Sequence, residues 1–545
     1  MIALDLLPPL IDPIWDTSAL IDDSSRAGGL LAAFTGYRAA RAAAARHACH
    51  LLGIGRAAAA AHVTAETGVV TDANAAVAAA AVRPPTGARG AKLAAIGEWL
   101  RRHARVVQAL QWGIVAAYAF FVIVPAFLPL PADDAHWFNS LALFSQWLFW
   151  GVWWPFVIAS MFVVGRAWCG LFCPEGTLTE AASRFGWHRP TPRWLRWGGW
   201  PFVAFAITTV YGQLVSVYQY PKAVLLVLGG STIAAIATGL VFGREKRVWC
   251  RYLCPVNGVF DVLSRVAPVH FRVDRERWAA NAGHMAIHPV NCAPMVRIRR
   301  MTGNAECHMC GRCAGHLDAV TLASRSPNDE VLDAHAEPTA WDAILIVVGV
   351  IGIAIGAFQW SASPWFVQAK VAATELVVDH GPAWLLADSA PWWLMTHYPE
   401  ANDVFTWLDG MLIVAYIAAA ALVLSAAVFM LLCAAARAAP APRVRNVWRL
   451  THALIPLAGL GVFLGLSSLT VALARAEGAW LGWVSWARVA LLAVGAAWSA
   501  YLFWRMLAAA QTTPRRVAAW TACCGAIAVI VAAWAVLFFI WSPVR

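Results

Sequence analysis

The sequence predicts an all-α protein that crosses a membrane about nine times, with duplicated helical hairpins and one large polar domain between them. Three observations lead to this prediction: the composition, the apolar runs and the charge of the loops between those runs. Of the 545 residues, 60% are hydrophobic and 13% are charged, whereas a soluble domain is about 45–50% apolar and about 25% charged. This imbalance is typical of a polytopic membrane protein.

Nine runs approach the roughly 20 apolar residues that a spanning helix needs. They cover about 109–128, 141–164, 198–218, 223–242, 341–360, 410–433, 450–473, 484–507 and 518–541. The pair at 198–242 is joined by the short connection YQYPK.

The loops between these runs alternate in charge. Arg and Lys gather before the first run and after every even-numbered run, and the other loops are poor in both. Because basic loops stay in the cytoplasm, we expect a multi-pass protein of a bacterial inner membrane, in contact with lipid, with a cytoplasmic amino terminus and a periplasmic carboxyl terminus. The same loops account for the net charge of +11. No nucleic-acid partner is expected, because no basic–aromatic patch accompanies the charge.

The runs divide the chain into four regions. Residues 1–108 form an Ala-rich cytoplasmic extension, in which 27–62 is either an amphipathic surface helix or poorly ordered. The start MIALDLLPPLIDPIWD lacks the basic and apolar parts of a signal peptide. Residues 109–242 form a four-helix membrane core, and 243–340 a cytoplasmic domain. Residues 341–545 form a five-helix membrane domain with a periplasmic loop at 361–408.

An internal repeat links the two hairpins of the membrane core. The second run ends in GRAWCGLFCPEG (165–176), and the fourth ends in GREKRVWCRYLCPVNG (243–258). Each contains Trp-Cys-x3-Cys-Pro-x2-Gly. Two duplicated hairpins would place both motifs side by side at the cytoplasmic surface.

The repeated motif supplies four cysteines, Cys169, Cys173, Cys250 and Cys254. The i, i+4 spacing puts each pair on one side of a helical turn, and the prolines that follow disfavour helical geometry at the second cysteine. Thiolates in such a bend suit an iron–sulfur cluster. The alternatives are small apolar residues at a helix end or a disulfide, which the cytoplasm disfavours.

A second group lies in VNCAPMVRIRRMTGNAECHMCGRCAGH (290–316). Cys307, Cys310 and Cys313 form the C-x2-C-x2-C run of bacterial ferredoxins, which normally continues to a Cys-Pro. Leu317 stands at that position. The fourth ligand is then Cys292, with His316, His308 or a cysteine of the repeated motif as alternatives. Four cysteines in one loop also suit structural zinc, although zinc sites usually use two separated C-x2-C pairs.

The remaining cysteines and histidines have simpler interpretations. Cys433, Cys523 and Cys524 lie in apolar runs and behave as small hydrophobic residues, and Cys49 has no partner in sequence. Three histidines have either a structural or a functional interpretation. In the functional interpretation, His452 holds a haem or contacts a quinone, and His380 and His397 contact a metal or a partner. No P-loop, nucleophile elbow or metalloprotease motif is present. We therefore expect a conduit for electrons with no catalytic residues of its own.

The repeated GRxWCxxxCPxG element and the cysteine loop resemble the membrane polyferredoxins of the NapH, NosR and CcoG type over residues 105–340. The loop NAECHMCGRC and the segment APWWLMTHYPEANDVFTWLDG are most similar to FtrD of ferrous-iron uptake systems. Residues 8–38 resemble the carboxyl-terminal tail of bacterial oxidase-dependent iron permeases, without the acidic helices that carry iron. The resemblance implies two [4Fe-4S] clusters held by the eight cysteines. Four basic residues of these segments either lie close enough to offset the charge of the clusters or are anchors of the cytoplasmic loops: Arg166, Lys246, Arg247 and Arg251.

The resemblance also implies partners. In such systems a periplasmic cupredoxin-like protein oxidises Fe²⁺, an iron permease imports Fe³⁺, and the polyferredoxin removes the electrons, so that loop 361–408 is the candidate docking surface. Because both clusters lie in the cytoplasm, about 30 Å of hydrocarbon separates them from this donor. A quinone from the membrane pool, or a haem at His452, would bridge the gap. The alternatives are a respiratory conduit for nitrate or nitrous oxide, a metal reductase or assembly factor, and a zinc-stabilised membrane sensor or scaffold.

Overall fold

The computed structural model describes residues 88–541, apart from residue 133 and the segments 283–289, 334–337, 438–442 and 510–511. The chain divides into two units after Thr86. The predicted amphipathic segment at 27–62, the permease-like tail at 8–38 and Cys49 therefore lie outside the described residues.

Eight helical segments of the described chain are long and apolar enough to cross a membrane: Ala104–Phe127, Leu141–Val164, Pro221–Val241, Ala340–Ala362, Trp407–Ala436, Val444–Ala476, Val484–Met506 and Thr513–Trp541. Each matches one of the predicted runs within a few residues. The run predicted at 198–218 forms a shorter helix, α9 (Trp200–Leu214), of 15 residues. At about 1.5 Å per residue, α9 is roughly 22 Å long.

Most of the long segments are built from several helical elements. The first four consist of α4 (Ala104–Ile123) and η2 (Val124–Phe127); α5 (Leu141–Gln146), η3 (Trp147–Trp153) and α6 (Trp154–Val164); α10 (Pro221–Val224), η5 (Leu225–Gly229) and α11 (Gly230–Val241); and α16 (Ala340–Ile344), η8 (Leu345–Ile353), α17 (Ala354–Gln359) and η9 (Trp360–Ala362). The last four consist of α19 (Trp407–Ala436); α20 (Arg443–Thr451), η12 (His452–Leu454) and α21 (Ile455–Ala476); α22 (Val484–Met506) and η13 (Leu507–Ala509); and α23 (Thr513–Ala535) and η14 (Val536–Trp541).

The two copies of the repeat fold alike. A five-residue helix follows each of two long segments: α7 (Ala167–Leu171) in the first copy and α12 (Val248–Tyr252) in the second. A second helix follows each Cys-Pro: α8 (Pro174–Phe185) and α13 (Asn257–Ser264). Cys173 has extended backbone angles, φ −67° and ψ 118°, as expected for a residue that precedes proline.

The predicted domain at 243–340 contains the cysteine loop, and we call it the cysteine-rich domain. It departs from the expected all-α fold. Strands β1 (Val269–Val273) and β2 (Val320–Ser324) pair antiparallel, with Phe271 opposite Leu322. Residues that stand opposite each other on paired strands have their side chains on the same face of the sheet. Both of these side chains are buried. Between the strands lie α14 (Arg275–Asn281), η6 (Ile298–Arg300) and η7 (His316–Asp318), and α15 (Asp329–Leu332) follows β2. Helix α3 (Ala88–Arg102) packs on β2, where a Cβ at Gly97 would lie 3.0 Å from the Leu322 Cβ.

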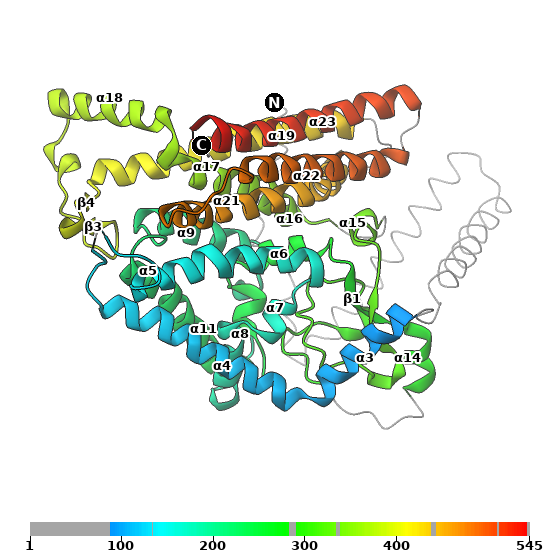
Figure 1. Ribbon diagram of the computed structural model, residues 1–545. Coiled ribbons are helices and arrows are strands. Elements are labelled where there is room, and N and C mark those ends of the chain that lie inside the picture. Colours follow the sequence, from blue (N-terminus) through cyan, green and yellow to red (C-terminus); the bar gives the residue numbers. More distant parts are fainter. Residues whose placement is uncertain are drawn as a thin grey trace, which may run out of the picture. The chain divides into compact units, whose positions relative to one another are not determined.

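We call the end of the long helices where the two Cys-Pro motifs lie the cysteine end, and the other end the distal end. In Figure 1, β1, α3 and α14 lie at the cysteine end, and α18 (Pro364–His380), β3 (His397–Tyr398) and β4 (Asp403–Val404) lie at the distal end. The loop that contains α18 also holds η10 (Ala383–Leu386) and η11 (Pro399–Ala401).

Helix α9 joins the two ends. Before it stands η4 (Trp194–Arg196), which follows α8 of the first Cys-Pro motif. After it, the backbone N–H of Thr396 in the distal loop donates to the carbonyl of Leu214, 2.8 Å away. The ring of Tyr220 stacks on Tyr398 with 3.6 Å between centroids.

The largest buried cluster joins the membrane core to the carboxyl-terminal helices. It contains Met161, Leu263, Ile351, Leu457 and Phe503, from both halves of the chain. Cys523 is fully buried in the same cluster, so it packs as the small hydrophobic residue that the sequence predicts. All of the described cysteines are free of disulfides.

Candidate iron–sulfur centre

The first candidate site is formed by the repeated motifs, and we call Cys169, Cys173, Cys250 and Cys254 site 1. The charges of Cys250 and Cys169 would act on a Cys173 thiolate, and those of Cys250 and Cys173 on a Cys254 thiolate. The cysteines of the first copy therefore lie close to the cysteines of the second copy. The repeat predicts that these four cysteines lie near one another, and four thiolates from two hairpins would make one four-ligand site.

The second candidate site is formed by the cysteine loop, and we call Cys292, Cys307, Cys310 and Cys313 site 2. Cys292, Cys307 and Cys310 would each act on the charge of a Cys313 thiolate. The chain curls between them, because Met309, Gly311 and Gly315 all have positive φ. Cys292 therefore joins the C-x2-C-x2-C run as its fourth cysteine.

Leu317 stands where a ferredoxin would carry its next cysteine, and its side chain is buried, with 5% exposed. The loop is fixed by Asn304, whose Nδ2 donates to the carbonyl of Val269, 2.7 Å away. The backbone N–H of Asn304 donates to Glu330, 2.9 Å away. The side chain of Leu317 is therefore part of the packing of the domain.

Burial raises the pKa of six of the site cysteines, which makes them poor thiolates without a metal. It raises the pKa of Cys250 and of Cys307 to about 12, and it raises the pKa of Cys173, Cys254 and Cys313 well above the ordinary value. Iron offsets this cost, because a coordinating thiol is deprotonated by the charge of the metal. Several sulfurs also accept backbone N–H groups: Cys173 from Gly176 and Cys307 from Met309, both at 3.4 Å. Such hydrogen bonds tune the potential of iron–sulfur clusters.

The spacing of the ligands differs between a cluster and a single metal ion. Among the described residues, no three His, Cys, Asp or Glu side chains converge as the ligands of one metal ion would. The four thiolates of a cubane bind four different irons, so they stand further apart than the ligands of a tetrahedral zinc, which lie about 2.3 Å from the metal.

The two sites are in direct contact. Gly170, between Cys169 and Cys173, lies against the backbone of site 2: a Cβ there would be 2.0 Å from the His308 carbonyl oxygen and 2.9 Å from the Cys310 nitrogen. Gln111 of α4 donates to the carbonyl of Gly170, 2.8 Å away. An electron can therefore pass between the sites through a few bonds and one backbone contact.

Arg247 lies between the sites and is 1% exposed. Its Nη1 donates to the carbonyl of Cys169 at 2.5 Å, and its backbone N–H donates to the carbonyl of Ala293 at 2.8 Å. Its charge acts on both Cys250 and Cys310. The guanidinium therefore offsets negative charge at both sites, and it is more than a surface anchor of the membrane orientation.

Arg166 is the second buried cation, 3% exposed. Its Nη1 donates to Ala305 O at 2.7 Å, and its Nη2 donates to Asn257 Oδ1 at 2.5 Å and lies 3.2 Å from His308 Nε2. The other two basic residues lie further out. Lys246 Nζ donates to the carbonyl of Cys292 at 3.2 Å, and Arg251 pairs with Glu306 at the surface.

The two histidines considered as alternative ligands each contact another side chain. His308 is buried, and its burial, together with the charge of Arg166, lowers its pKa well below the ordinary value. Its Nε2 faces Arg166, so the neutral ring carries its proton on Nδ1. His316 packs against Trp278 with 4.9 Å between ring centroids.

The other histidines lie apart from both sites. His452 contacts Arg265 at 3.1 Å and Asp342 at 3.7 Å, which engages its Nε2. His397 lies in β3, and His380 ends α18. Neither joins a group of three potential metal ligands within the described chain.

Two glutamates on α8, the half-buried Glu175 and the buried Glu180, were missed by the sequence analysis. Glu175 accepts from Trp249 Nε1 at 2.9 Å, and burial raises its pKa. Glu180 pairs with Arg247 at 2.8 Å and with Arg312 at 2.7 Å. Burial alone would raise the pKa of Glu180, but these two charges outweigh it and hold the pKa below its ordinary value. Their place in an amphipathic helix of ordinary composition gave no signal.

A surface cavity reaches site 2. It has a volume of about 390 Å³, and its lining includes Cys310, Gly170 and Arg312. This cavity brings solvent to one side of the cysteine loop, whereas Cys169 and Cys250 of site 1 are buried.

Comparison with known proteins agrees with the motifs. The pattern of the 4Fe-4S binding domain matches residues 146–192 and 225–274, which are the two copies of the repeat. YccM of Escherichia coli (strain K12), a candidate electron-transport protein, is 24% identical over 236 residues, which are 38% of this chain and 64% of the relative. MauN of Methylorubrum extorquens, a ferredoxin-type protein of methylamine utilization, is 28% identical over 139 residues, 23% of this chain and 48% of the relative.

The chain thus spans less than two thirds of the length of each of these relatives. No solved structure matches it. The chain carries a 4Fe-4S ferredoxin-type domain in a mostly helical fold with membrane-spanning character, and it is homologous to proteins of electron transport.

Proposed function

We propose that this chain is a membrane-bound electron-transfer protein that holds two [4Fe-4S] clusters, one at site 1 and one at site 2. The observation that carries the proposal is the convergence of eight cysteines in two groups of four whose backbones touch at Gly170 and Cys310. Two buried arginines lie beside these groups and supply positive charge. Within the part of the chain that the structure describes, single-electron transfer is the activity that this arrangement supports best.

Metal analysis and spectroscopy of the purified full chain test this proposal. We expect about eight irons and eight acid-labile sulfides per chain, and low-temperature EPR of the reduced protein with the interaction of two neighbouring clusters. Cys254→Ser should remove the site 1 signal, and Cys313→Ser that of site 2. One or two zinc ions with no EPR signal would instead support the zinc-stabilised scaffold.

We further propose that the protein crosses a bacterial inner membrane nine times, with the cysteine end in the cytoplasm. Both Cys-Pro motifs follow the ends of long segments, at Val164 and Val241, and both lie at the cysteine end. The chain must therefore cross once between them, and α9 is the helix that reaches the distal loop. Basic residues gather at the cysteine end, which supports a cytoplasmic location. Alkaline phosphatase fused after residue 220 should be active, and the same fusion after residue 190 should be inactive.

The electron donor we propose is a periplasmic cupredoxin-like protein of ferrous-iron uptake, which would dock on the distal loop 361–408. Support comes from the resemblance of this loop to FtrD, and from Trp365, Trp384 and Trp393, which are 65%, 57% and 52% exposed. Aromatic side chains are enriched where proteins bind each other. Trp384→Ala and Trp393→Ala should slow reduction of the clusters by such a donor and leave reduction by dithionite unchanged. Equal rates would remove this loop as the docking surface.

A further inference from the structure

Two cavities lie among the long helices, and they share a wall. The first, of about 370 Å³, lies at the distal end and is lined at its mouth by Arg475, Arg488 and Ser468. The second, of about 160 Å³, is lined by apolar and aromatic side chains and reaches Pro255 and Val256, directly after the site 1 cysteine Cys254. Six residues line both: Trp150, Gln213, Tyr218, Ala357, Phe358 and Leu466. Together the cavities lead from the distal end of the helices to site 1.

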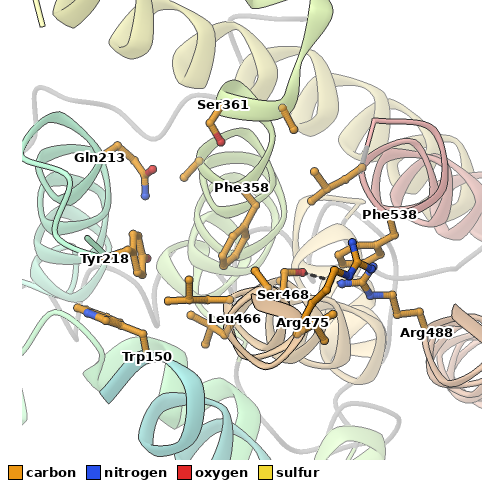
Figure 2. Close-up of a pocket in the computed structure, with 17 residues that line it drawn as sticks. Trp150, Gln213, Tyr218, Phe358, Ser361, Leu466, Ser468, Arg475, Arg488 and Phe538 are labelled. Atoms are coloured by element: carbon orange, nitrogen blue, oxygen red, sulfur yellow. Dashed lines mark hydrogen bonds between the residues drawn. The ribbon is translucent and has the colours of Figure 1, made fainter. Parts of the chain in front are cut away.

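Hydrogen-bond donors stand at two opposite walls of the first cavity. Figure 2 shows Gln213 and Tyr218 on one side and Arg475, Arg488 and Ser468 on the other, with Phe358 and Leu466 between them. The oxygen of Gln213 accepts from Trp360 Nε1 at 2.8 Å, and this bond turns its amide NH₂ group away from Trp360. The lining contains two guanidinium groups and no acidic side chain, so a ligand with acceptor oxygens would complement it.

Arg488 is the strongest sign that a ligand is missing. It is 4% exposed, its Nη2 donates to Ser468 at 3.2 Å, and its Nε has no partner. The ring of Phe538 lies 4.6 Å from its guanidinium carbon. Among the described residues, no acidic side chain forms an ion pair with Arg488 or with its neighbour Arg475. A buried cation without an anion is costly, and a charged residue inside a membrane bundle marks a functional site by default.

We propose that the first cavity binds the headgroup of a quinone, which exchanges electrons with the cluster at site 1. The two carbonyl oxygens of a para-quinone lie at opposite ends of a flat ring, so each would accept from one donor wall while the ring packs on Phe358. A phosphate headgroup concentrates its acceptors at one end and would leave one wall unpartnered. The second cavity extends from the quinone site toward Cys254 within the protein interior.

The exchange balances with the two clusters. One quinone takes two electrons, one from each reduced one-electron cluster, and two protons from water at the distal mouth, and becomes a quinol. In the reverse direction, a quinol returns two electrons to the two oxidised clusters and releases two protons. This inference rests on the proposed function, and it gives the electrons a path between the clusters and the distal end, across most of the roughly 30 Å of hydrocarbon.

The test uses the full chain in lipid nanodiscs with decylubiquinone as the probe. Bound quinone is measured by equilibrium dialysis, and electron transfer by the loss of the reduced-cluster EPR signal when the quinone is added. Arg488→Leu removes donors from one wall, and Leu466→Trp fills the space between the walls. Arg505→Leu is the matched control, because Arg505 lies on the same helix at the opposite end, where it donates to Tyr501 at 2.7 Å.

Hydrogen bonds to charged groups contribute about 1.5–3 kcal/mol each. We therefore expect Arg488→Leu to weaken quinone binding about ten- to a hundredfold, since 1.4 kcal/mol is about tenfold in affinity. Leu466→Trp should abolish binding, and Arg505→Leu should match the wild type. Iron content should stay unchanged in all three variants, so that loss of binding is not loss of the clusters.

Three outcomes would overturn the proposal. The first is equal binding to the wild type and to Leu466→Trp. The second is a binding constant of Arg488→Leu equal to that of the control. The third is a stoichiometric anionic phospholipid, found by mass spectrometry, that decylubiquinone does not displace, which would make the cavity a lipid site. A protein that binds quinone in the expected way but contains no iron would overturn the proposed function and leave the quinone site standing.

Discussion

Gly170 packs against Cys310 with no room for a side chain. A methyl group added at Gly170 would lie 2.9 Å from the Cys310 nitrogen and 2.0 Å from the carbonyl oxygen of His308. These residues belong to different cysteine motifs, 140 positions apart in the sequence, and their backbone contact holds site 1 and site 2 together. The contact is therefore a point at which the distance between two clusters can be altered without touching a ligand.

Gly170→Ala should push the two sites apart. Overpacking a well-packed interior costs about 1–3 kcal/mol, and here the obstacle is backbone that cannot rotate away. We expect a weaker magnetic interaction between the clusters in EPR and a lower melting temperature. Gly113→Ala is the matched control: Gly113 lies in α4 with nothing within 4 Å of the added methyl, so it should be neutral or stabilise by about 0.5–1 kcal/mol. Equal behaviour of the two variants would contradict the contact.

Arg247→Met should act on both sites at once. The variant removes a buried cation and leaves Glu180 with Arg312 as its main partner. Breaking a buried pair costs about 3–5 kcal/mol. Because a nearby positive charge favours the reduced form of a cluster, the reduction potentials of both clusters should fall, which a redox titration followed by EPR measures.

Arg251→Met serves as the comparison for this variant. Arg251 pairs with Glu306, whose side chain is 53% exposed, and such pairs contribute at most about 1 kcal/mol. The reduction potentials of both clusters in Arg251→Met should stay close to those of the wild type. If Arg247→Met shifted the potential of one cluster alone, the guanidinium would not lie between the sites as the structure has it.

Much of this fold could be predicted from the sequence, because the signals are local. A run of apolar residues dictates a spanning helix wherever it occurs, and the segment 141–164 was predicted with the bounds that the structure gives. The repeat predicts the pairing of Cys169 and Cys173 with Cys250 and Cys254, since duplicated hairpins place equal motifs at one surface. The bend at Cys173 follows from Pro174 alone.

The parts that could not be predicted depend on contacts between distant segments. Nothing near Gly170 in the sequence shows that the loop around His308 will pack on it, and nothing near Arg488 shows that it will lack an acidic partner. The strands β1 and β2 stand 46 residues apart and are too short to be distinguished from loop by periodicity. Helix α9 was expected to be longer, but it begins after Gly199 and ends before Ser216, whose φ of 50° is outside helical geometry.

Cys292→Ser tests the ligand on which site 2 depends most. The structure places Cys292 beside Cys307, Cys310 and Cys313, whereas Leu317 occupies the core. We expect the variant to lose one iron or the whole second cluster, which iron analysis and the EPR spectrum separate from loss of site 1. His308→Gln and His316→Gln should keep about eight irons. Loss of the second cluster in a histidine variant, with Cys292→Ser unaffected, would move the fourth ligand to that histidine.

The cysteine-rich domain should lose stability in mild acid because of His270 on β1. Burial, followed by the charges of Arg325 and Arg272, lowers the pKa of His270 to about 4, and its Nδ1 has no partner. The unfolded chain takes up a proton near pH 6.5, and the folded domain does not. The unfolded state therefore binds more protons between about pH 6.5 and pH 4, and stability falls as the pH falls through that window.

The expected loss is about 2 kcal/mol at pH 5 relative to pH 8. Denaturant unfolding at both values, followed by the cluster absorbance, measures it. His270→Gln cannot take up this proton, so its stability should change less between the two values. His103→Gln, at the exposed residue between α3 and α4, should keep the full dependence of the wild type. If the two variants lost equal stability on acidification, the acid sensitivity would arise from another group, because His270 would then titrate alike in the folded and unfolded chain.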